Sequence, residues 1–292
     1  FGRADLGDFR NTRRVVSMAD TAMRVQGGTI SSVFRSRKDR EAAYDLLENK
    51  RVSADAVGHA AAEAAAVRSR GLPWVWVLVD GTSLTLTDKK QTKGFGSLGS
   101  GRQTTRGLKV VTSVLLDPAG VVLGVGEFTW WARTGLPNKL PGGKRRKDNS
   151  TRKLEDKETY RWHETMTATR KTLRTQAPQT QRWWVMDREA DSWSLLHEAC
   201  RDGDLFTIRS NVDRKLQVDK SSNNAWLRQT LARQAVLGEY ELRVPAAQGR
   251  RARTARMQVR ACRVTLDMRS KNPNRPCPLQ VNALWLVEAG TT

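Results

Sequence analysis

Two short apolar runs that each end in an aspartate constrain the fold of this chain most strongly. Trp74 to Val79 precede Asp80, and Trp183 to Met186 precede Asp187. Runs of this length, rich in valine and tryptophan, are typical of buried strands and are too short for helices. The first run has the composition of a central strand that is covered on both faces. A carboxylate inside such a strand costs several kcal/mol unless it is paired or bound to a cation.

The residues after Asp187 predict a strand that leads into a helix. Residues 193–200 have helical spacing, and Asp191 or Ser192 can cap the first turn. Open α/β sheets bind ligands at such strand ends. If the two strands are neighbours, Asp80 and Asp187 converge on a divalent ion, and their oxygen atoms favour Mg²⁺, with Mn²⁺ as an alternative. Taken alone, Asp187 has the simpler interpretation of a polar loop residue or a cap.

The charge of the chain predicts a polyanionic partner. Among 292 residues, 51 are Lys or Arg and 30 are Asp or Glu, which gives a net charge of +21 and a pI near 10.7. This excess suits nucleic acid, and here double-stranded DNA. A membrane surface also attracts cations, but no run approaches the ~20 apolar residues of a spanning helix. The cations gather at Arg10, Arg13 and Arg14, at Arg35, Arg37, Lys38 and Arg40, at Lys144 to Lys147, and at Arg250 to Arg260.

Cysteine and histidine do not form a recognisable site. The three cysteines have no metal-like spacing, which favours a reducing cytoplasm over a disulfide framework. The three histidines are scattered, and each is interpreted as a surface or core residue. The phosphate-binding loop of nucleotide-driven enzymes has no match either.

The pattern of elements predicts an α/β (α+β) chain in three parts. Residues 1–70 have helical periodicity and predict a helical DNA-binding domain, with a plain interaction domain as the alternative. Residues 71–210 predict the sheet-containing core, and residues 211–292 predict a β-rich insertion. The expected helices of the first part include Ser36–Leu47 and Ala54–Val67.

Within the core, three strands are expected to form an antiparallel meander. The strand 74–79 is followed by Gly107–Leu116 and Val121–Trp131, which are joined by a turn at 117–120. Residues 133–153 predict an exposed loop that can lie on phosphates. A helix over Leu154–Leu173 and a strand over Leu205–Arg209 complete this part. In the tail, we expect a short helix at Trp226–Ala235 and strands at Gly238–Val244, Ala255–Met268 and Leu279–Glu288.

A meander, a helix and a fourth strand that carries an acid together resemble the ribonuclease H-like fold. The chain as a whole resembles the bacterial cut-and-paste DDE transposases of the Tn-five type, in the insertion sequence four family. The matching segments are ADLGDFRNTRR, EAAYDLLENKRVSADAV, VDGTSL, SLGSGRQTTRGLKVVTSVLL, EFTWWAR, MDREADSWSLL, LFTIRSN and LGEYELRVP.

The resemblance implies a DNA transposase that binds transposon ends and target DNA, and that cleaves and transfers strands with Mg²⁺. It implies a homodimer in the DNA complex and a location at the bacterial nucleoid. Asp80 and Asp187 match the first two catalytic, metal-binding acids of the family. The expected DNA-binding residues are Arg10, Arg13, Arg14, Arg106, Arg209, Arg250, Arg251 and Arg253.

The chain departs from the family at the third catalytic acid. In the family this acid is a glutamate on a helix beyond the insertion, within a Y-R-E-K-W-R-like motif, and the sequence contains no such motif. Glu288 matches a strand residue of the insertion instead. We therefore expect a truncated transposase whose insertion is cut short. The alternatives are a non-catalytic DNA-binding relative that inhibits a full-length partner, and a ribonuclease H-like nuclease unrelated to transposition.

Overall fold

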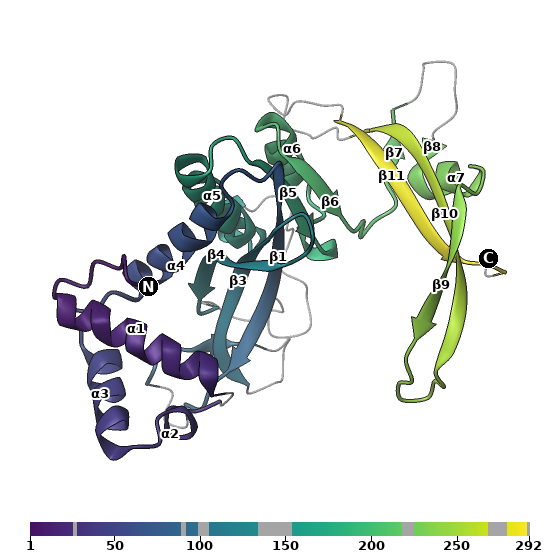
Figure 1. Ribbon diagram of the computed structural model, residues 1–292. Coiled ribbons are helices and arrows are strands. Elements are labelled where there is room, and N and C mark those ends of the chain that lie inside the picture. Colours follow the sequence, from purple (N-terminus) through teal and green to yellow (C-terminus); the bar gives the residue numbers. More distant parts are fainter. Residues whose placement is uncertain are drawn as a thin grey trace, which may run out of the picture. The chain divides into compact units, whose positions relative to one another are not determined.

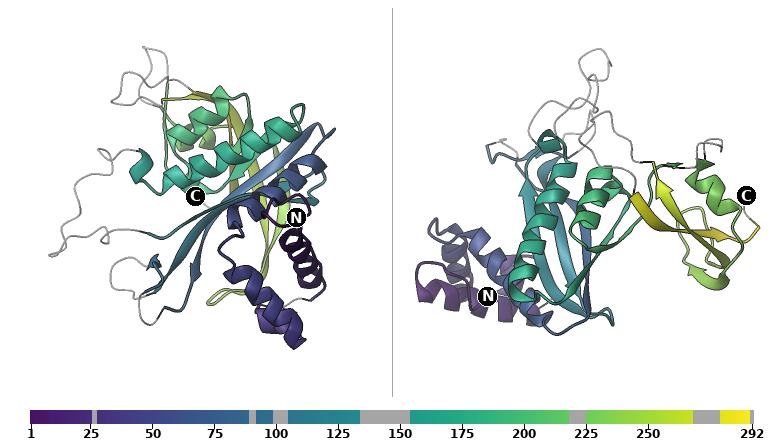
Figure 2. Two further views of the ribbon diagram at one scale, coloured as in Figure 1. Left: turned by 90° about the vertical axis from the view of Figure 1, so that its left-hand side faces the viewer. Right: turned by 90° about the horizontal axis from the view of Figure 1, so that it is seen from above.

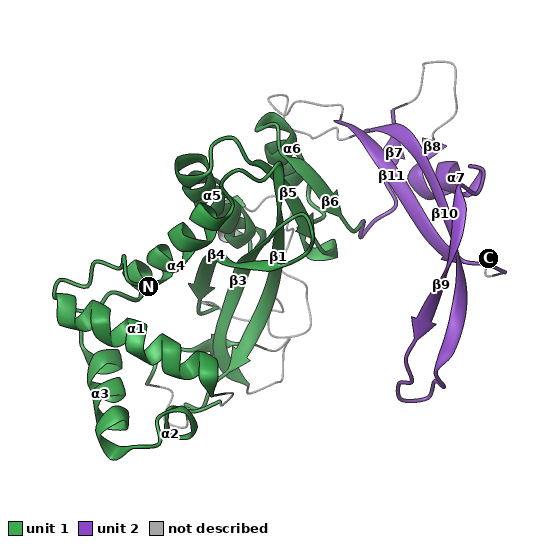
Figure 3. Cartoon of the chain, in the orientation of Figure 1, with its two compact units in different colours: residues 1–209 green, residues 210–292 purple. Residues whose placement is uncertain are grey.

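A computed structural model describes residues 1–25, 28–88, 92–98, 105–133, 154–217, 225–267 and 279–290. The chain forms two compact units, Phe1–Arg209 and Ser210–Thr292 (Figures 1 and 3). The first unit holds both the helices expected in residues 1–70 and the expected core. Whether those helices form a domain of their own stays a prediction. Most of the expected phosphate-binding loop at 133–153, with the Lys144 to Lys147 cluster, lies outside the described residues.

In the described residues, four helices form the N-terminal part of the first unit; the periodicity predicted three of them, and the short α2 was not predicted. Each follows a polar residue whose side chain accepts a hydrogen bond from a backbone N–H of the first turn, and this satisfies a donor that has no partner within the helix. These capping residues are Asp8, Thr29, Ser36 and Ser53. The helices are α1 (Phe9–Arg24), α2 (Ile30–Val33), α3 (Arg37–Glu48) and α4 (Ala54–Arg68).

A mixed sheet is the centre of the first unit. Its main strands lie in the order β4, β3, β1, β5, β6, and β2 also pairs with β3. The strands β4, β3 and β1 form the predicted antiparallel meander, whereas β1, β5 and β6 are parallel. The α/β (α+β) prediction is confirmed. The strand bounds are β1 (Trp74–Thr85), β2 (Gly96–Ser97), β3 (Arg106–Leu116), β4 (Val122–Trp131), β5 (Gln181–Met186) and β6 (Leu205–Ile208).

Helices pack on one face of this sheet, as the views in Figure 2 make visible. They include α5 (Thr159–Gln176) and α6 (Trp193–Arg201). The single turn η1 (Leu154–Asp156) precedes α5, and the single turn η2 (Arg188–Ala190) precedes α6. The hydrophobic core lies between the helices and the sheet. Its buried members include Val75, Val77, Val79, Trp184 and Met186 from the strands, Met166 and Leu173 from α5, Leu195 from α6 and Ala65 from α4.

The expectation that β1 is covered on both faces is wrong. Burial alternates along the strand: Val77 and Val79 face the core, whereas Leu78 is 37% exposed and Asp80 is exposed. The reason is that the core of the described part of this unit lies on one face of the sheet only. Asp80 is therefore solvated, and the expected cost of burying its carboxylate does not arise.

A buried ionic cluster joins α5 to the strands. The carboxylate of Asp204 accepts hydrogen bonds from Arg170 Nε (2.9 Å), Arg182 Nε (2.6 Å) and the Trp184 indole (2.8 Å). Its side chain is fully buried, and buried charges require such partners. Arg170 also binds Glu198 of α6 at 2.7 Å. The cluster thus fixes where α5 and α6 lie on the sheet.

In its described residues, the second unit is a β-rich sheet with one short helix, as predicted. The long strand β10 pairs with β11 along most of its length, with β9 over its first half and with β7 at its end. The helix packs on β10 and β11, and its residues Leu227 and Leu231 are buried, as are Val264 and Leu266 of β10. The elements are β7 (Lys215–Leu216), β8 (Ala225–Trp226), α7 (Leu227–Ala232), β9 (Gly238–Val244), β10 (Arg253–Leu266) and β11 (Leu279–Glu288).

Candidate carboxylate site and nucleic-acid interface

Asp80 and Asp187 occupy matching positions on neighbouring parallel strands. The last pair in the register of β1 and β5 is Val79 with Met186. Asp80 directly follows Val79, and Asp187 directly follows Met186. Neighbouring strands lie about 4.8 Å apart. Both aspartates follow residues that face the core, so both lie on the side of the sheet away from the helices. The expected adjacency of the two strands is confirmed, whereas the catalytic and metal-binding roles of the acids stay predictions.

Each carboxylate is exposed and makes a local hydrogen bond. Asp80 Oδ1 accepts from the backbone N–H of Gly81 at 2.8 Å, and Asp187 Oδ1 accepts from the N–H of Glu189 at 2.7 Å. Asp187 thus caps the single turn η2, which is the simpler role considered for it. One oxygen of each carboxylate has no such bond, so capping leaves it available to a cation.

Arg209 lies next to Asp187, at the end of the neighbouring strand β6. It follows Ile208, which pairs with Met186, and its backbone N–H donates to the carbonyl of Met186 at 3.2 Å. Asp80 within β1, Asp187 directly after β5 and Arg209 directly after β6 therefore follow paired residues of the three strands, and all three are exposed. Such a row places a cation beside two anions, which suits a phosphate held next to a metal ion.

The donor set fits a hard divalent cation in part. Mg²⁺ is commonly held by one or two carboxylates while water and substrate phosphates complete its shell, so Asp80 and Asp187 suit it. Within the described ranges, no group of three His, Cys, Asp or Glu side chains comes together that could hold a metal ion. Glu189 and Asp191 accordingly do not complete a three-carboxylate site.

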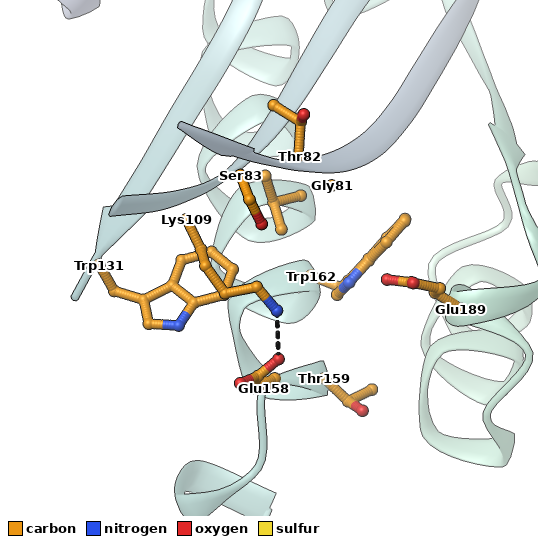
Figure 4. Close-up of a pocket in the computed structure, with 10 residues that line it drawn as sticks. Gly81, Thr82, Ser83, Lys109, Trp131, Glu158, Thr159, Trp162 and Glu189 are labelled. Carbon is orange, nitrogen blue, oxygen red and sulfur yellow. Dashed lines mark hydrogen bonds and ion pairs between the residues drawn. The ribbon is translucent and has the colours of Figure 1, made fainter. Parts of the chain in front are cut away.

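A pocket lies on the opposite, helix-covered side of the sheet, next to the end of β1 (Figure 4). Its cavity is about 150 Å³. Trp131 and Trp162 lie on either side of the Lys109 amino group, and Glu189 lies beyond Trp162 (Figure 4). The complete lining is Gly81, Thr82, Ser83, Lys109, Val111, Trp131, Glu158, Thr159, Trp162 and Glu189.

The carboxylate of Glu158 forms ion pairs with two basic side chains at this pocket. It binds Lys109 Nζ at 2.6 Å and Arg133 Nε at 2.5 Å. Burial raises the pKa of Glu158, but the hydrogen bonds from Arg133 and Lys109 outweigh it, and the pKa lies below its usual value. Glu158 is thus anionic at neutral pH. The Lys109 amino group also lies 5.7 Å from the centre of the Trp131 ring, which is a cation–π contact.

His163 belongs to a hydrogen-bonded chain rather than to a metal site. Its Nδ1 lies 2.5 Å from Glu198 Oε2, and its Nε2 lies 3.0 Å from Ser194 Oγ in the first turn of α6. Burial raises the pKa of Glu198, yet the hydrogen bonds from His163 and Arg170 lower it to about 2. This chain links α5 to the start of the helix that follows Asp187.

The three arginines expected to contact DNA near the N-terminus share one face of α1. Arg10, Arg13 and Arg14 have helical spacing and are all exposed, whereas Val15 on another side packs toward the Leu6 cluster. Arg10 forms an exposed ion pair with Asp8 at 2.9 Å, so Arg13 and Arg14 carry the less neutralised charge. This face is a suitable contact for a phosphate backbone.

The other expected DNA-binding arginines differ in how freely they reach solvent. The Arg106 guanidinium is half-buried and donates to the carbonyl of Phe95. In the second unit, Arg250 and Arg251 are exposed in the turn between β9 and β10, and Arg253 pairs with Glu288 of β11 (2.7 Å). Their contacts with DNA stay predictions.

Sequence reasoning did not find the pocket. Its walls come from segments that are far apart in the chain, namely 81–83, Lys109, Trp131, 158–162 and Glu189. The only available signals were the paired tryptophans in EFTWWAR and the acid in DREAD, and neither specifies a face of the sheet. The pairing of Lys109 with Trp131 in the β3–β4 register brings the wall together.

Comparison with known proteins identifies the N-terminal segment. Residues 1–52 match the family model described as Transposase DNA-binding. These residues contain α1, α2 and α3, and among them eleven Lys or Arg stand against seven Asp or Glu. The match supports a transposase-like DNA-binding function with DNA as the partner. In the described part of the chain, no helix has the length and apolar character required to cross a membrane.

Proposed function

We propose that this chain is a DNA transposase of the cut-and-paste, DDE type, related to the Tn-five-like family. The observation that carries the proposal is the match of residues 1–52 to a transposase DNA-binding family. The order of the strands around β1, with Asp80 within β1 and Asp187 directly after β5, supports a ribonuclease H-like core. Transposon ends and target DNA are the proposed substrates, bound by a homodimer.

In the proposed mechanism, the chain positions a phosphodiester at the row of Asp80, Asp187 and Arg209. Bound Mg²⁺, or Mn²⁺, supplies Lewis-acid stabilisation and an activated oxygen nucleophile. The two carboxylates hold the cation, and their rigid strands fix the spacing between them. Arg209 places a positive charge where the phosphate gains negative charge. Arg10, Arg13 and Arg14 anchor the duplex without contributing to the reaction.

A non-catalytic DNA-binding relative is the second candidate, and one observation favours it. Only two carboxylates come together at the proposed metal site among the residues that the structure describes. Such a chain would occupy DNA ends and inhibit an active partner. The two candidates share the DNA-binding segment, so they differ only in whether metal-dependent cleavage occurs.

Duplex binding is the first test of the proposal. We expect the affinity for a duplex to fall steeply as salt rises, because phosphate contacts release counterions. Replacing both Arg13 and Arg14 by Gln should lower the affinity and reduce the slope of log K against log salt by roughly 1 per lost phosphate contact. Arg201→Gln is the control, since Arg201 is an exposed arginine at the end of α6. A flat salt response would show that the basic face of α1 is not the contact surface.

Cleavage is the second test, and it separates the two candidates. We expect Asp187→Ala to abolish Mg²⁺-dependent cleavage while duplex affinity changes little, because Asp187 lies apart from α1 in the fold. Asp191→Ala is the matched control, an acid of the same segment. Cleavage that survives in Asp187→Ala would refute the metal-binding assignment, and a wild-type chain that binds duplex but never cleaves would favour the inhibitor.

A further inference from the structure

The strand β11 lies at one edge of the sheet in the second unit (Figure 1). Among the described strands it pairs with β10 alone, and that register runs without interruption from Leu279 to Glu288. A strand of ten residues is long for a sheet edge. Its outer side presents backbone N–H and C=O groups to which another strand can bond.

The bonds to β10 show which residues of β11 face outward. The backbone N–H of Ala289 donates to the carbonyl of Arg256 at 2.8 Å, and these two residues continue the register of the two strands. Along an antiparallel pair, every second residue bonds the neighbouring strand. The odd-numbered residues of β11 therefore bond β10, and the even-numbered residues direct their backbone groups outward. Four of these have no backbone bond to any residue that the structure describes, namely Gln280, Asn282, Leu284 and Leu286.

The outer edge of β11 carries no charge. Leu284 is 65% exposed and Leu286 is 52% exposed. Residues 279–287 include no Lys, Arg, Asp, Glu or Pro, although proteins commonly protect an exposed edge with such residues. The strand β9, on the other side of β10, has a charged side chain at every second position, namely Glu239, Glu241 and Arg243. Charge thus protects the β9 edge, whereas the β11 edge is open.

A second copy of β11 matches this edge. Two identical strands can pair antiparallel about a two-fold axis perpendicular to the sheet, which gives a closed interface. With Ala283 of each copy at the axis, Asn282 lies opposite Leu284, and Gln280 lies opposite Leu286. All four outward-facing residues then bond the other copy, and no like charges face each other within residues 279–287.

We propose that the outer edge of β11 pairs with β11 of a second copy, so that the sheets of two chains join. The inference rests on the proposed function in that it gives the proposed homodimer an interface, but the contact itself requires no DNA. A strand of another protein could use the same backbone groups, yet the uncharged edge offers no charge by which to select one. The two-fold arrangement uses the outward-facing groups of both copies. A contact through one strand is small, so the dimer is weak and depends on concentration.

Sedimentation velocity of the full chain without DNA tests the contact. We expect the average mass to rise from that of a monomer toward that of a dimer between about 1 and 100 µM protein, the range in which weak contacts saturate. The buffer contains about 0.15 M salt or more, because the net charge of +21 makes the two copies repel each other at low salt.

Asn282→Pro is the decisive variant. Proline has no N–H, and an edge strand tolerates it where that N–H faces solvent. The variant therefore keeps the bonds between β11 and β10 but removes one outward-facing donor from each copy. The loss of two hydrogen bonds, together with the ring at the contact, should raise the dissociation constant about tenfold or more.

Leu284→Lys and Leu242→Lys form a matched pair of variants. Both replace an exposed leucine by a cation on the same face of the sheet, but Leu242 lies on β9. Leu284→Lys brings two like charges close to the two-fold axis and should also weaken the dimer, whereas Leu242→Lys should leave it unchanged. Circular dichroism checks that each variant is folded, and Leu284→Lys keeps the test decisive if Asn282→Pro does not fold.

The outcomes separate this contact from the proposed function. A chain that stays monomeric up to about 100 µM would overturn the contact, whether or not it binds duplex DNA. A dimer that survives in both Asn282→Pro and Leu284→Lys would place the interface elsewhere and would also overturn it. Loss of the dimer in Leu242→Lys would assign the contact to the apolar face of the sheet instead of the edge. A chain that dimerises through β11 but does not bind duplex DNA would refute the proposed function and leave the contact intact.

Discussion

The charge of Glu198 links α5 to α6 through His163 and Arg170. The carboxylate accepts hydrogen bonds from His163 and Arg170, and these lower its pKa to about 2 although burial opposes them. Because the folded-state pKa lies below the ordinary value of 4.5, ionised Glu198 stabilises the fold fully above pH 4.5. This contribution is lost as the pH falls from 4.5 toward 2.

This gives a pH-dependent prediction for Glu198→Gln. At pH 6 the variant should be less stable than the wild-type protein, because the neutral amide loses the ionic part of both contacts. The difference in free energy of unfolding should shrink steadily between pH 4.5 and pH 3, because Glu198 takes up a proton in the unfolded wild-type chain while it stays ionised in the folded protein. Urea unfolding of both proteins at each pH measures this difference in free energy of unfolding. A difference that stays constant down to pH 3 would show that Glu198 is not held as an anion.

Asp80 illustrates what the sequence can and cannot say about one residue. Its place after an apolar run correctly predicted a strand, which continues past Asp80 to Thr85, and the parallel pairing with β5 brings Asp187 beside it. Its burial was wrongly expected, because an uninterrupted apolar run looks the same whether one face of the strand is covered or both. Leu78 and Asp80 are exposed since the core lies on the other face.

At the scale of elements, the backbone of β1 approaches β3 closely at Gly107. A Cβ at this position would lie 1.8 Å from the backbone oxygen of Leu84, so no larger residue fits without moving a strand. We expect Gly107→Ala to destabilise the protein by about 1–3 kcal/mol or more. A change in the midpoint of chemical unfolding measures this cost.

Gly58→Ala is the matched control, since it is the same substitution in the helix α4. Nothing lies within 4 Å of a Cβ at Gly58, and alanine favours the helix over glycine by roughly 0.5–1 kcal/mol. The control should therefore raise the stability. If Gly107→Ala unfolded at the wild-type midpoint, the close approach of β1 and β3 would be incorrect.

At the scale of the whole molecule, each compact unit has a core of its own. The core of residues 1–209 lies between the sheet and its helices, whereas Leu227, Leu231, Val264 and Leu266 are buried in residues 210–292. We therefore expect two unfolding transitions. Leu231→Ala should destabilise the second unit by about 2–5 kcal/mol and shift one transition only.

Differential scanning calorimetry of the wild-type and Leu231→Ala proteins measures the two transitions. Leu195→Ala, in the core of the first unit, is the reciprocal control and should shift the other transition. A single transition that moves equally in both variants would mean that the two cores unfold as one cooperative unit.

The sequence by itself determined most of the elements of this protein and indicated DNA as its partner. Local periodicity, caps and turns specify helices and strands over short distances, so most of the helices, the meander and the β-rich tail were predictable. The basic composition and the N-terminal segment pointed to DNA. These properties depend on neighbouring residues, which a single sequence displays directly.

Only the tertiary structure decided which residues meet. The parallel pairing of β1 with β5 and β6 aligns Asp80, Asp187 and Arg209, and the pairing of β3 with β4 sets Trp131 opposite Lys109. The face of the sheet on which α5 and α6 pack also decides which face stays uncovered and on which face the pocket forms. Such contacts join residues far apart in the chain, and no local pattern encodes the face or the register that brings them together.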